Sequence, residues 1–408
     1  MKLRLTTRKE RTRLKWQVNL VIFLVFFIAF LMIMRDLNLY LSPTKKVDSK
    51  FMVVEGFLPD YTLKQVVKEF HEGDYEHILI TGKPMGQGYY IAGVNADSDL
   101  VRASLMRMGM DSTKMTSIAI PATVFRDRTY NTGLILYNYL RENNLDHDKV
   151  NVYTLGCHAR RSQVLFQKAV GDEIEIGIIA GEDRSYDRKK WWKSSKGFRT
   201  VINETLAYLY VSIVFHPDIE QSLNDLDKGY YIDEIQNHRN DKDIQFANTN
   251  RPLTEEQRET FSSLNYFPVN EKFNVKVKFI EDPIKREFEM PTSTDRLPIY
   301  RNYGKLHFMI DGEEYTLTAY QNMGYLESNP GSDYLFIPYN DLTNAIESYG
   351  GGRYLDFAIP KTDSVYLDFN LSYNPLCSYN HRYSCPVPPE ENELNVRIEA
   401  GEMNYDDH

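Results

Sequence analysis

The fold is decided by the stretch NVYTLGCHARRSQVLFQK, residues 151–168. An apolar run at 152–155 stops at Gly156 and an amphipathic helix pattern follows, which predicts a strand, a tight turn and a helix start. Unpaired backbone N–H groups at such a junction favour a bound anion. A solvated basic helix start would show the same cluster, so both interpretations stay open. The turn carries Cys157, His158, Arg160 and Arg161.

Short apolar runs alternate with helical patterns on both sides of this stretch. Strands joined by helices of this length form a parallel sheet that helices cover on both faces. We therefore predict an α/β domain at 51–215, with its binding loops at the carboxyl ends of the strands. The other expected strands are 51–55, 77–81, 117–120 and 174–180, and the expected helices are 61–71, 97–109, 130–142 and 197–214.

Residues 16–34, WQVNLVIFLVFFIAFLMIM, form an apolar run about long enough to cross a bilayer core as a helix. The segment before it, 1–15, holds seven basic side chains and one acidic one. The positive-inside rule places that segment in the cytoplasm. A cleaved signal peptide is the rival interpretation, but no small-residue cleavage site follows the run.

We therefore expect a transmembrane signal anchor that crosses the inner (plasma) membrane once. Residues 35–50 are then a short stalk, and the main domains lie outside the cytoplasm, which means the periplasm if the cell is a Gram-negative bacterium. The chain of 408 residues is 42% hydrophobic and 13% aromatic, which is enough for two packed domains. Its formal net charge of -9 argues against nucleic acid as a partner.

Five short motifs follow one another in the α/β segment: VVEGFLPD (53–60), ILITG (78–82), RMGM (107–110), DRTYNTG (127–133) and GCHARRSQVLF (156–166). In this order and spacing they resemble the YdcF/SanA/ElyC envelope family, also called DUF218, over about 51–215. The resemblance implies a Rossmann-like three-layer domain, commonly tethered to a membrane and linked to cell-envelope integrity, peptidoglycan or lipid-carrier metabolism. It also implies that nucleotide-like ligands are bound by some members.

The family's residues carry over only in part. Asn131 and Thr132 match its Asn-Thr motif, and His158 and Arg161 match its His-x-x-Arg motif. Leu134 stands where the family has a glutamate, and Thr81-Gly82-Lys83 stands for its Ser-Gly-Gly. These departures indicate a subgroup.

The chemistry of these side chains points to a phosphorylated ligand. Arg161 offers a planar fork for a phosphate, and Arg160 or Lys83 could neutralise a second oxygen. His158 and Asp127 are the candidate catalytic residues, with His158 able to act as a general acid or base near neutral pH. Asp127 could also merely cap the following helix. The candidate ligand-binding residues are Glu55, Gly56, Gly82, Lys83, Asn131, Thr132, Arg160 and Arg161.

Three carboxylates and one cysteine are further candidates for chemistry in this region. Glu55, Asp97 and Asp127 could act as bases or hold a divalent cation, but no spacing here dictates a metal or names a cofactor. Cys157 beside His158 could be a nucleophile. A small buried residue in a strand-end turn is the more common role for such a cysteine.

The remainder of the chain differs in composition and in its predicted secondary structure. Residues 216–252 are polar and are expected to form a linker, partly helical, and 403–408 a tail. Between them, 253–402 shows short strand-like runs separated by turns, with a hairpin signal at Asp311-Gly312, which predicts a β-rich sandwich or barrel. The expected strands are 273–280, 305–310, 315–319, 334–337, 354–358, 366–369 and 394–398.

The motifs of this second half are longer than those of the first. IYRNYGKLHF (299–308), YLFIPYNDLTN (334–344), YGGGRYLDF (349–357) and the run 367–402 resemble the DUF1684 domain. Its polar residues could bind a sugar or an anion, or could hydrogen-bond internally. Cys377 and Cys385 are expected to form a disulfide in an oxidising compartment, although their spacing with His381 could also suit a metal. The polar residues in question are Arg353, Asp356, Asp368, Asn370, Tyr373 and Asn374.

Two functions of different kinds follow. The first is binding, or hydrolase or transferase processing, of a phosphorylated envelope precursor, either a lipid-linked phosphate or a nucleotide-like ligand, at the His158 and Arg161 cluster. The second is a non-catalytic envelope scaffold whose β-rich domain binds glycan or a protein.

Overall fold

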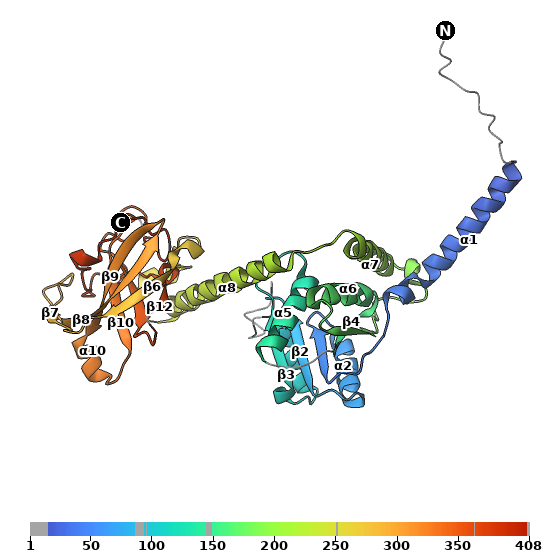
Figure 1. The fold of residues 1–408 in the computed structure, drawn as a ribbon, viewed down its shortest axis with the longest axis horizontal. Helices are drawn as coiled ribbons and strands as arrows, with labels where there is room; N and C mark the ends of the chain where they lie inside the picture. Colours follow the sequence, from blue (N-terminus) through green and yellow to red (C-terminus); the bar gives the residue numbers. More distant parts are fainter. Residues whose placement is uncertain are drawn as a thin grey trace, which may run out of the picture. The chain divides into compact units, whose positions relative to one another are not determined.

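The structure is a computed structural model that describes residues 15–85, 94, 96–143, 149–249, 252–362 and 364–405. The predicted basic segment, apart from Lys15, and the last residues of the predicted tail lie outside these ranges. The chain divides into two compact units, Met1–Tyr230 and Tyr231–His408. Each unit is described by itself below (Figure 1).

The first helix, α1 (Trp16–Leu41), is long and apolar enough to cross a membrane. Nearly all of its side chains are exposed up to Leu37, and they are apolar on every face up to Met34, as on a helix that lipid surrounds. The helix does not end at Met34, because it continues to Leu41, where Asn38 and Leu41 are buried. The expected stalk is therefore packed against the domain, and Lys45 exchanges two backbone hydrogen bonds with Ile178.

A five-stranded parallel sheet forms the centre of the first unit, which confirms the predicted α/β architecture. Its strand order is β3-β2-β1-β4-β5. The strands β2 and β3 are therefore added on one side of β1, and β4 and β5 on its other side. The central strands β1, β2 and β4 are almost continuously buried, as expected for a sheet covered on both faces, whereas the edge strand β3 is mostly half-buried. Their bounds are β1 (Phe51–Glu55), β2 (His77–Gly82), β3 (Met115–Ala119), β4 (Lys149–Leu155) and β5 (Glu175–Gly181).

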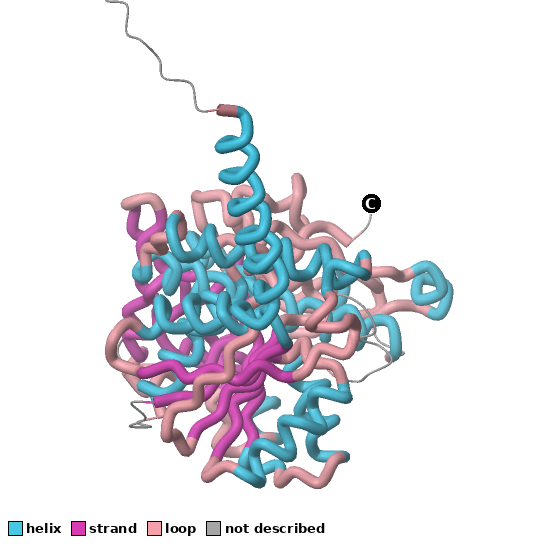
Figure 2. The backbone as a smooth tube through the Cα atoms, turned by 90° about the vertical axis from the view of Figure 1, so that its right-hand side faces the viewer, coloured by secondary structure: helices cyan, strands magenta, loops and turns pink. Residues whose placement is uncertain are grey.

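Helices lie on both faces of this sheet (Figure 2). Met52 and Val54 of β1 pack with α2 (Asp60–Glu72) and α4 (Asp97–Arg107). Phe51 and Val53, which point the opposite way, pack with α5 (Arg128–Glu142) and α6 (Ala159–Val170). The helix α7 (Ser195–Ile213) contacts α6 and the end of α1.

The expected polar linker is one continuous helix, α8 (Ile219–Asn248). Leu226, Ile235 and Phe246 are buried along it. Polar composition predicted a linker here, but these widely spaced apolar residues provide enough burial to fix a helix.

The second unit contains a nearly closed antiparallel sheet, in the order β11-β10-β9-β8-β6-β12, with β7 paired to β8. The hairpin predicted at Asp311-Gly312 is confirmed, and both residues have positive φ, as its tight turn requires. The strand expected at 394–398 is wrong, because this segment is irregular. The strands are β6 (Asn274–Glu281), β7 (Glu287–Glu289), β8 (Ile299–Ile310), β9 (Glu313–Asn322), β10 (Tyr334–Tyr339), β11 (Arg353–Ala358) and β12 (Ser364–Asp368).

Candidate functional site

A cavity of about 540 Å³ lies at the carboxyl ends of the parallel strands. Glu55 is the last residue of β1 and His158 follows β4, so the cavity sits where the strand order reverses, the usual ligand position in such sheets. Eight of the ten candidate residues line it: Glu55, Gly56, Gly82, Lys83, Asp127, Thr132, His158 and Arg161.

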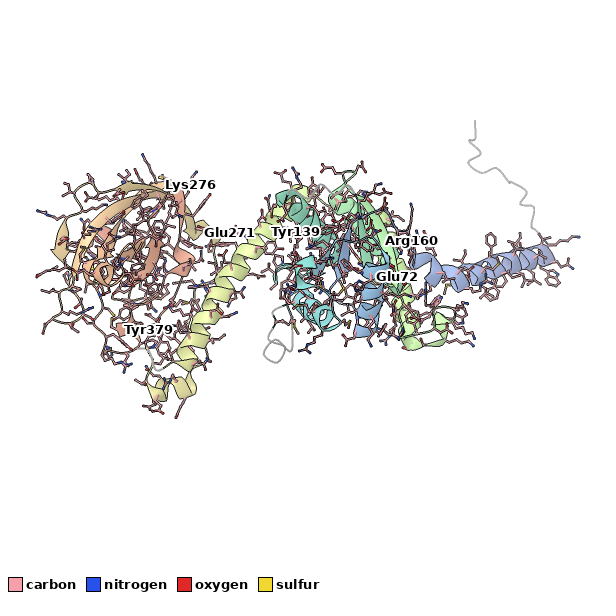
Figure 3. The ribbon with its side chains drawn as sticks, turned by 90° about the horizontal axis from the view of Figure 1, so that it is seen from below. Glu72, Tyr139, Arg160, Glu271, Lys276 and Tyr379 are labelled. Atoms are coloured by element: carbon pink, nitrogen blue, oxygen red, sulfur yellow. The ribbon has the colours of Figure 1, made fainter. Side chains whose placement is uncertain are left out.

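The other two candidates, Asn131 and Arg160, are engaged elsewhere. The Asn131 amide donates to the carbonyl of Arg126 at 3.2 Å. Arg160 turns toward α1, where its Nε donates to the carbonyl of Tyr40 and its guanidinium lies 3.9 Å from the centre of the Tyr40 ring. Figure 3 shows Arg160 beside the end of α1. Arg160 therefore fixes α1 to the unit and lies outside the pocket lining.

The best-defined group at the cavity is a cluster in which His158 and Arg161, from the cavity wall, bond to Glu204 of α7, which is not itself a lining residue. Arg161 Nε donates to Glu204 Oε2 at 2.8 Å, and Arg161 Nη2 donates to Glu204 Oε1 at 3.2 Å. Burial alone would raise the pKa of Glu204, but the hydrogen bonds from His158 and Arg161 lower it to about 2. Glu204 is therefore ionised at neutral pH and holds both of its partners in place.

Sequence reasoning missed Glu204, which comes from α7. The signal was present, because Glu204 is the one charged residue between 200 and 215, a stretch otherwise largely apolar. A single acid in the middle of a helix of this kind needs a buried partner. What the sequence could not give was the partner's identity, since His158 is 46 positions away.

The proton on His158 has two available positions. Its Nδ1 lies 3.0 Å from Glu204 Oε1 and 2.8 Å from Arg161 Nη2. One ring nitrogen cannot donate to the first and accept from the second at once. With the proton on Nδ1, His158 donates to Glu204 and leaves a lone pair on Nε2, whereas a bond from Arg161 places the proton on Nε2. Either a base or an acid can thus be presented at Nε2 with the ring in one position.

The Nε2 atom of His158 faces Glu55. It lies 3.8 Å from Glu55 Oε1, and among the described residues no group forms a hydrogen bond with it. Glu55 is nearly buried and its other oxygen accepts from Ser162 Oγ at 3.1 Å. The gap between the imidazole and the carboxylate is too long for a direct hydrogen bond, so a proton would pass between them through water or a ligand group.

Two helices begin at the cavity with their amide groups uncapped by side chains. Helix α5 starts after Asp127 and helix α6 starts after His158, and neither residue caps its helix with a side-chain hydrogen bond. Asp127 has φ of 49°, a left-handed conformation that is costly for a non-glycine residue. The capping role considered for Asp127 is thus not what its carboxylate does. The start of α5 leaves N–H groups that favour an anion in this cavity, whereas α6 continues the 3-10 turn Gly156–His158, whose Gly156 carbonyl already accepts the N–H of Ala159.

Gly56 and Gly82 allow a close approach of α4. A Cβ on Gly82 would lie 2.4 Å from the backbone nitrogen of Ser98, and one on Gly56 would lie 2.4 Å from the carbonyl oxygen of Thr81. The two glycines therefore let the first turn of α4 sit directly on the strand ends. Lys83, next to them, lies 3.7 Å from Asp97 at the start of α4.

The remaining acidic and basic groups give the cavity a mixed charge. Lys83, Arg128 and Arg161 are cationic, whereas Glu55, Asp97 and Asp127 are acidic. The hydroxyl of Thr132 donates to the carbonyl of Arg128 at 2.8 Å, so its proton is already used. No group of three or more metal-ligating side chains comes together among the described residues.

Cys157 is buried behind the cavity. Its sulfur accepts a hydrogen bond from Tyr186 at 3.4 Å, and Tyr186 in turn accepts from Asn38 of α1 at 2.8 Å. Burial raises the pKa of the Cys157 thiol to about 11. A protonated, buried thiol is a poor nucleophile, which favours the packing role.

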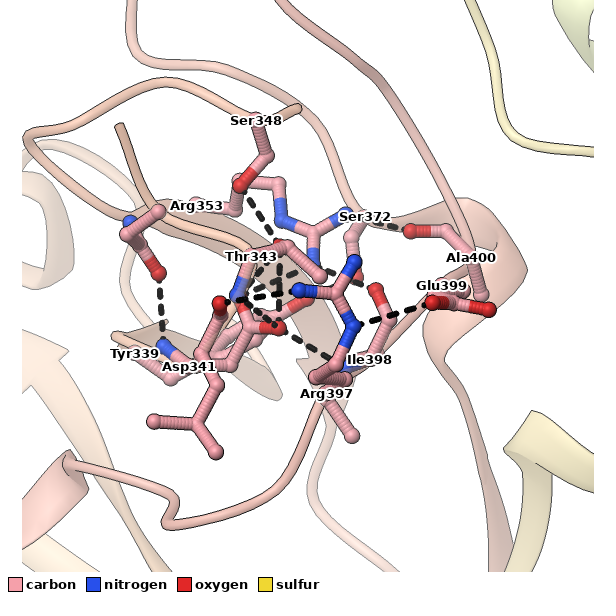
Figure 4. A network of polar contacts seen from close by, with 12 residues as sticks. Tyr339, Asp341, Thr343, Ser348, Arg353, Ser372, Arg397, Ile398, Glu399 and Ala400 are labelled. Carbon is pink, nitrogen blue, oxygen red and sulfur yellow. Dashed lines mark hydrogen bonds and ion pairs between the residues drawn. The ribbon is translucent and has the colours of Figure 1, made fainter. Parts of the chain in front are cut away.

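In the β unit, the polar residues considered for ligand binding bond internally, and Figure 4 shows the network around one of them, Arg353. Arg353 is fully buried, and it donates to Asp341 at 3.1 Å, to the carbonyl of Ile398 at 2.8 Å and to the carbonyl of Ala400. Tyr373 donates to Asp356 at 2.6 Å, and Asn374 donates to the carbonyl of Met403 at 2.8 Å. This pattern corresponds to the internal hydrogen-bonding alternative.

The two cysteines of the β unit are adjacent free thiols. Cys377 and Cys385 are both buried, and the N–H of Cys377 donates to the sulfur of Cys385 at 3.2 Å. The predicted disulfide is not formed in this structure, and the pairing stays a prediction for an oxidising compartment. The metal alternative with His381 finds no ligand group among the described residues.

Comparison with known proteins gives a family model that matches the second half of the chain. Residues 259–403 match the model described as "Protein of unknown function (DUF1684)", in agreement with the resemblance of that half. No curated protein matches the chain. Among solved structures, an uncharacterized protein from Haloarcula marismortui, determined by solution NMR, is 33% identical. The match covers 44% of this chain and 97% of that one, with a TM-score of 0.36.

Proposed function

We propose that this protein is a membrane-anchored envelope protein whose α/β unit binds and processes a phosphorylated precursor. The ligand class is a lipid-linked phosphate or a nucleotide-like molecule. In this proposal α1 is a single-pass anchor with its N-terminus in the cytoplasm, and both units lie outside the cytoplasm. The same proposal assigns a Rossmann-like fold to this unit, on the basis of its resemblance to the YdcF/SanA/ElyC family.

One observation carries the proposal: His158 and Arg161 line a cavity at which helix α5 begins, and both bond to Glu204. The start of α5 and Arg161 suit the oxygens of a phosphate. A histidine that is oriented by a carboxylate suits proton transfer.

In a hydrolytic step, water would attack phosphorus and give its proton to the basic Nε2 of His158, directly or through Glu55. The bond between phosphorus and the leaving oxygen would break, and that oxygen would receive a proton from the acidic form of the same group. Arg161 would stabilise the charge on the phosphoryl oxygens.

The test is ligand-dependent thermal stabilisation of the full-length protein in detergent, with nucleotides and prenyl phosphates as probes. We expect a stabilising shift for the unsubstituted protein and loss of most of that shift for Arg161→Lys, which keeps the charge but removes the fork. Arg160→Lys is the matched control, because Arg160 faces α1, and it should keep the shift. Equal shifts in all three proteins would remove Arg161 from the ligand site.

The second function, glycan binding by the β unit, receives less support. Arg353, Tyr373 and Asn374 use their polar groups inside the unit. Glycan binding by the full-length protein that His158→Ala leaves unchanged would favour this scaffold function.

A further inference from the structure

The outer side of α7 carries an unusual apolar stripe. Four large side chains, Phe198, Leu206, Leu209 and Ile213, are between 46% and 68% exposed. Their spacing places them on one side of the helix. The other side of α7 holds Glu204 and faces the cavity. Contiguous exposed apolar residues of this kind usually mark a surface that something covers.

This stripe is continuous with the end of the membrane-spanning part of α1. The indole nitrogen of Trp191, directly before α7, donates to the carbonyl of Met34 at 3.1 Å, and the ring of Phe198 stacks on that of Trp191 at 6.1 Å. Met34 is the last apolar residue before Arg35 and Asp36. The start of α7 therefore lies at the level where α1 would leave a bilayer. Figure 1 shows α7 on the side of the unit from which α1 projects.

The segment that leads into α7 has the composition of a headgroup-binding surface. Residues 188–199, RKKWWKSSKGFR, contain six basic side chains and no acidic one. Trp192 is 42% exposed, and most of the basic residues are exposed as well. Exposed tryptophan is typical of membrane interfaces, and clustered lysines and arginines are attracted to anionic lipids.

We propose that residues 188–213 lie on the surface of the bilayer that α1 spans, with the apolar stripe of α7 in the lipid and the basic residues against anionic headgroups. The inference rests on the anchor proposed above. It adds that the cavity, whose wall includes Ala207, Tyr210 and Val211 of α7, lies at the headgroup layer. A second copy of the chain is the alternative to lipid as the cover of this stripe, and the experiment distinguishes the two.

The test uses the full-length protein in nanodiscs of phosphatidylcholine with phosphatidylglycerol. A nitroxide is attached to a single introduced cysteine, and its collisions with oxygen, which concentrates in lipid, are compared with those of a water-soluble nickel chelate. The three native cysteines are buried, and labelling of the unsubstituted protein measures their background. The positions are Leu206→Cys on the stripe, Val25→Cys in α1 and Met106→Cys on α4, across the sheet from α7; all three native side chains are exposed.

We expect labels at positions 25 and 206 to favour oxygen and the label at 106 to favour the nickel chelate. Exchange of Lys189 and Lys193 for glutamate should weaken the oxygen preference at 206 and leave that at 25 unchanged. Oxygen preference at 25 with nickel preference at 206 would overturn the inference and leave the anchor intact. Nickel preference at 25 would overturn both. Dipolar broadening between labels at 206 would identify a second copy as the occupant and would also overturn the inference.

Discussion

Arg161 in the α/β unit and Arg353 in the β unit each bond to a carboxylate, at 2.8 Å and 3.1 Å. Their surroundings differ. The Arg353 side chain is 0% exposed, and backbone carbonyls take most of its donors. The Arg161 side chain is 20% exposed, lines a cavity, and bonds to side chains alone among the described residues. A buried arginine whose donors are filled by backbone holds a fold together, whereas one beside a cavity can accept a ligand as a further partner.

The largest expected effect comes from breaking the buried ion pair of Arg353 and Asp341. Arg353→Ala would leave Asp341 buried without its cation and would release the irregular segment around Ile398, so we expect a loss of about 3–5 kcal/mol in the free energy of unfolding. Chemical denaturation followed by tyrosine fluorescence would measure it. Arg397→Ala, an exposed arginine that also pairs with carboxylates, is the matched control and should change stability little. A similar result for both variants would contradict the structural role of Arg353.

An intermediate effect concerns the ion pair of Arg161 and Glu204 beside the cavity, whose contribution to stability depends on pH. The pKa of Glu204 is lowered from 4.5 to about 2, so its contribution is complete above pH 4.5 and is lost as the pH falls toward 2. We expect the unsubstituted protein to lose about 3 kcal/mol more than Glu204→Gln over this interval. Unfolding free energies measured at several pH values would show it. Exposed Glu327 supplies the control, since Glu327→Gln should retain the steep loss.

The smallest effect separates Cys157 from the neighbouring cluster. We expect Cys157→Ala to cost about 1 kcal/mol through lost packing and to leave ligand-dependent stabilisation unchanged. Thermal melts with and without prenyl phosphate would check both values. Loss of the ligand shift in a variant that still folds would return Cys157 to the list of functional residues.

The sequence predicted the parts of the fold that depend on local pattern. Apolar runs that end in glycine located β1, β2 and β4. Polar composition concealed α8, because few widely spaced apolar residues fix it. The irregular 394–398 segment resembled a strand because its alternate residues are apolar, yet its backbone bonds to Arg353 and Asp341.

The site was predictable only as far as single motifs reach. The His-x-x-Arg pattern selected His158 and Arg161, but the contact that Arg160 makes could not be predicted without knowing that α1 packs beside α6. Glu204 could not be assigned to the site because the sequence does not show that α7 passes beside His158 and Arg161. Asn131 was included through its motif, and its amide instead bonds to the backbone of Arg126.

The end of α1 has a mechanical consequence. Leu41 is buried, Asn38 bonds to Tyr186, and Arg160 bonds to the carbonyl of Tyr40, so the helix enters the domain without a hinge. Where α1 spans a bilayer, the domain is carried by a rigid post and not by a flexible tether. The cavity then stays at one height and one tilt above the lipid while the protein diffuses laterally. Its search for a molecule in the same membrane takes place in two dimensions, and each encounter presents the same edge of the cavity.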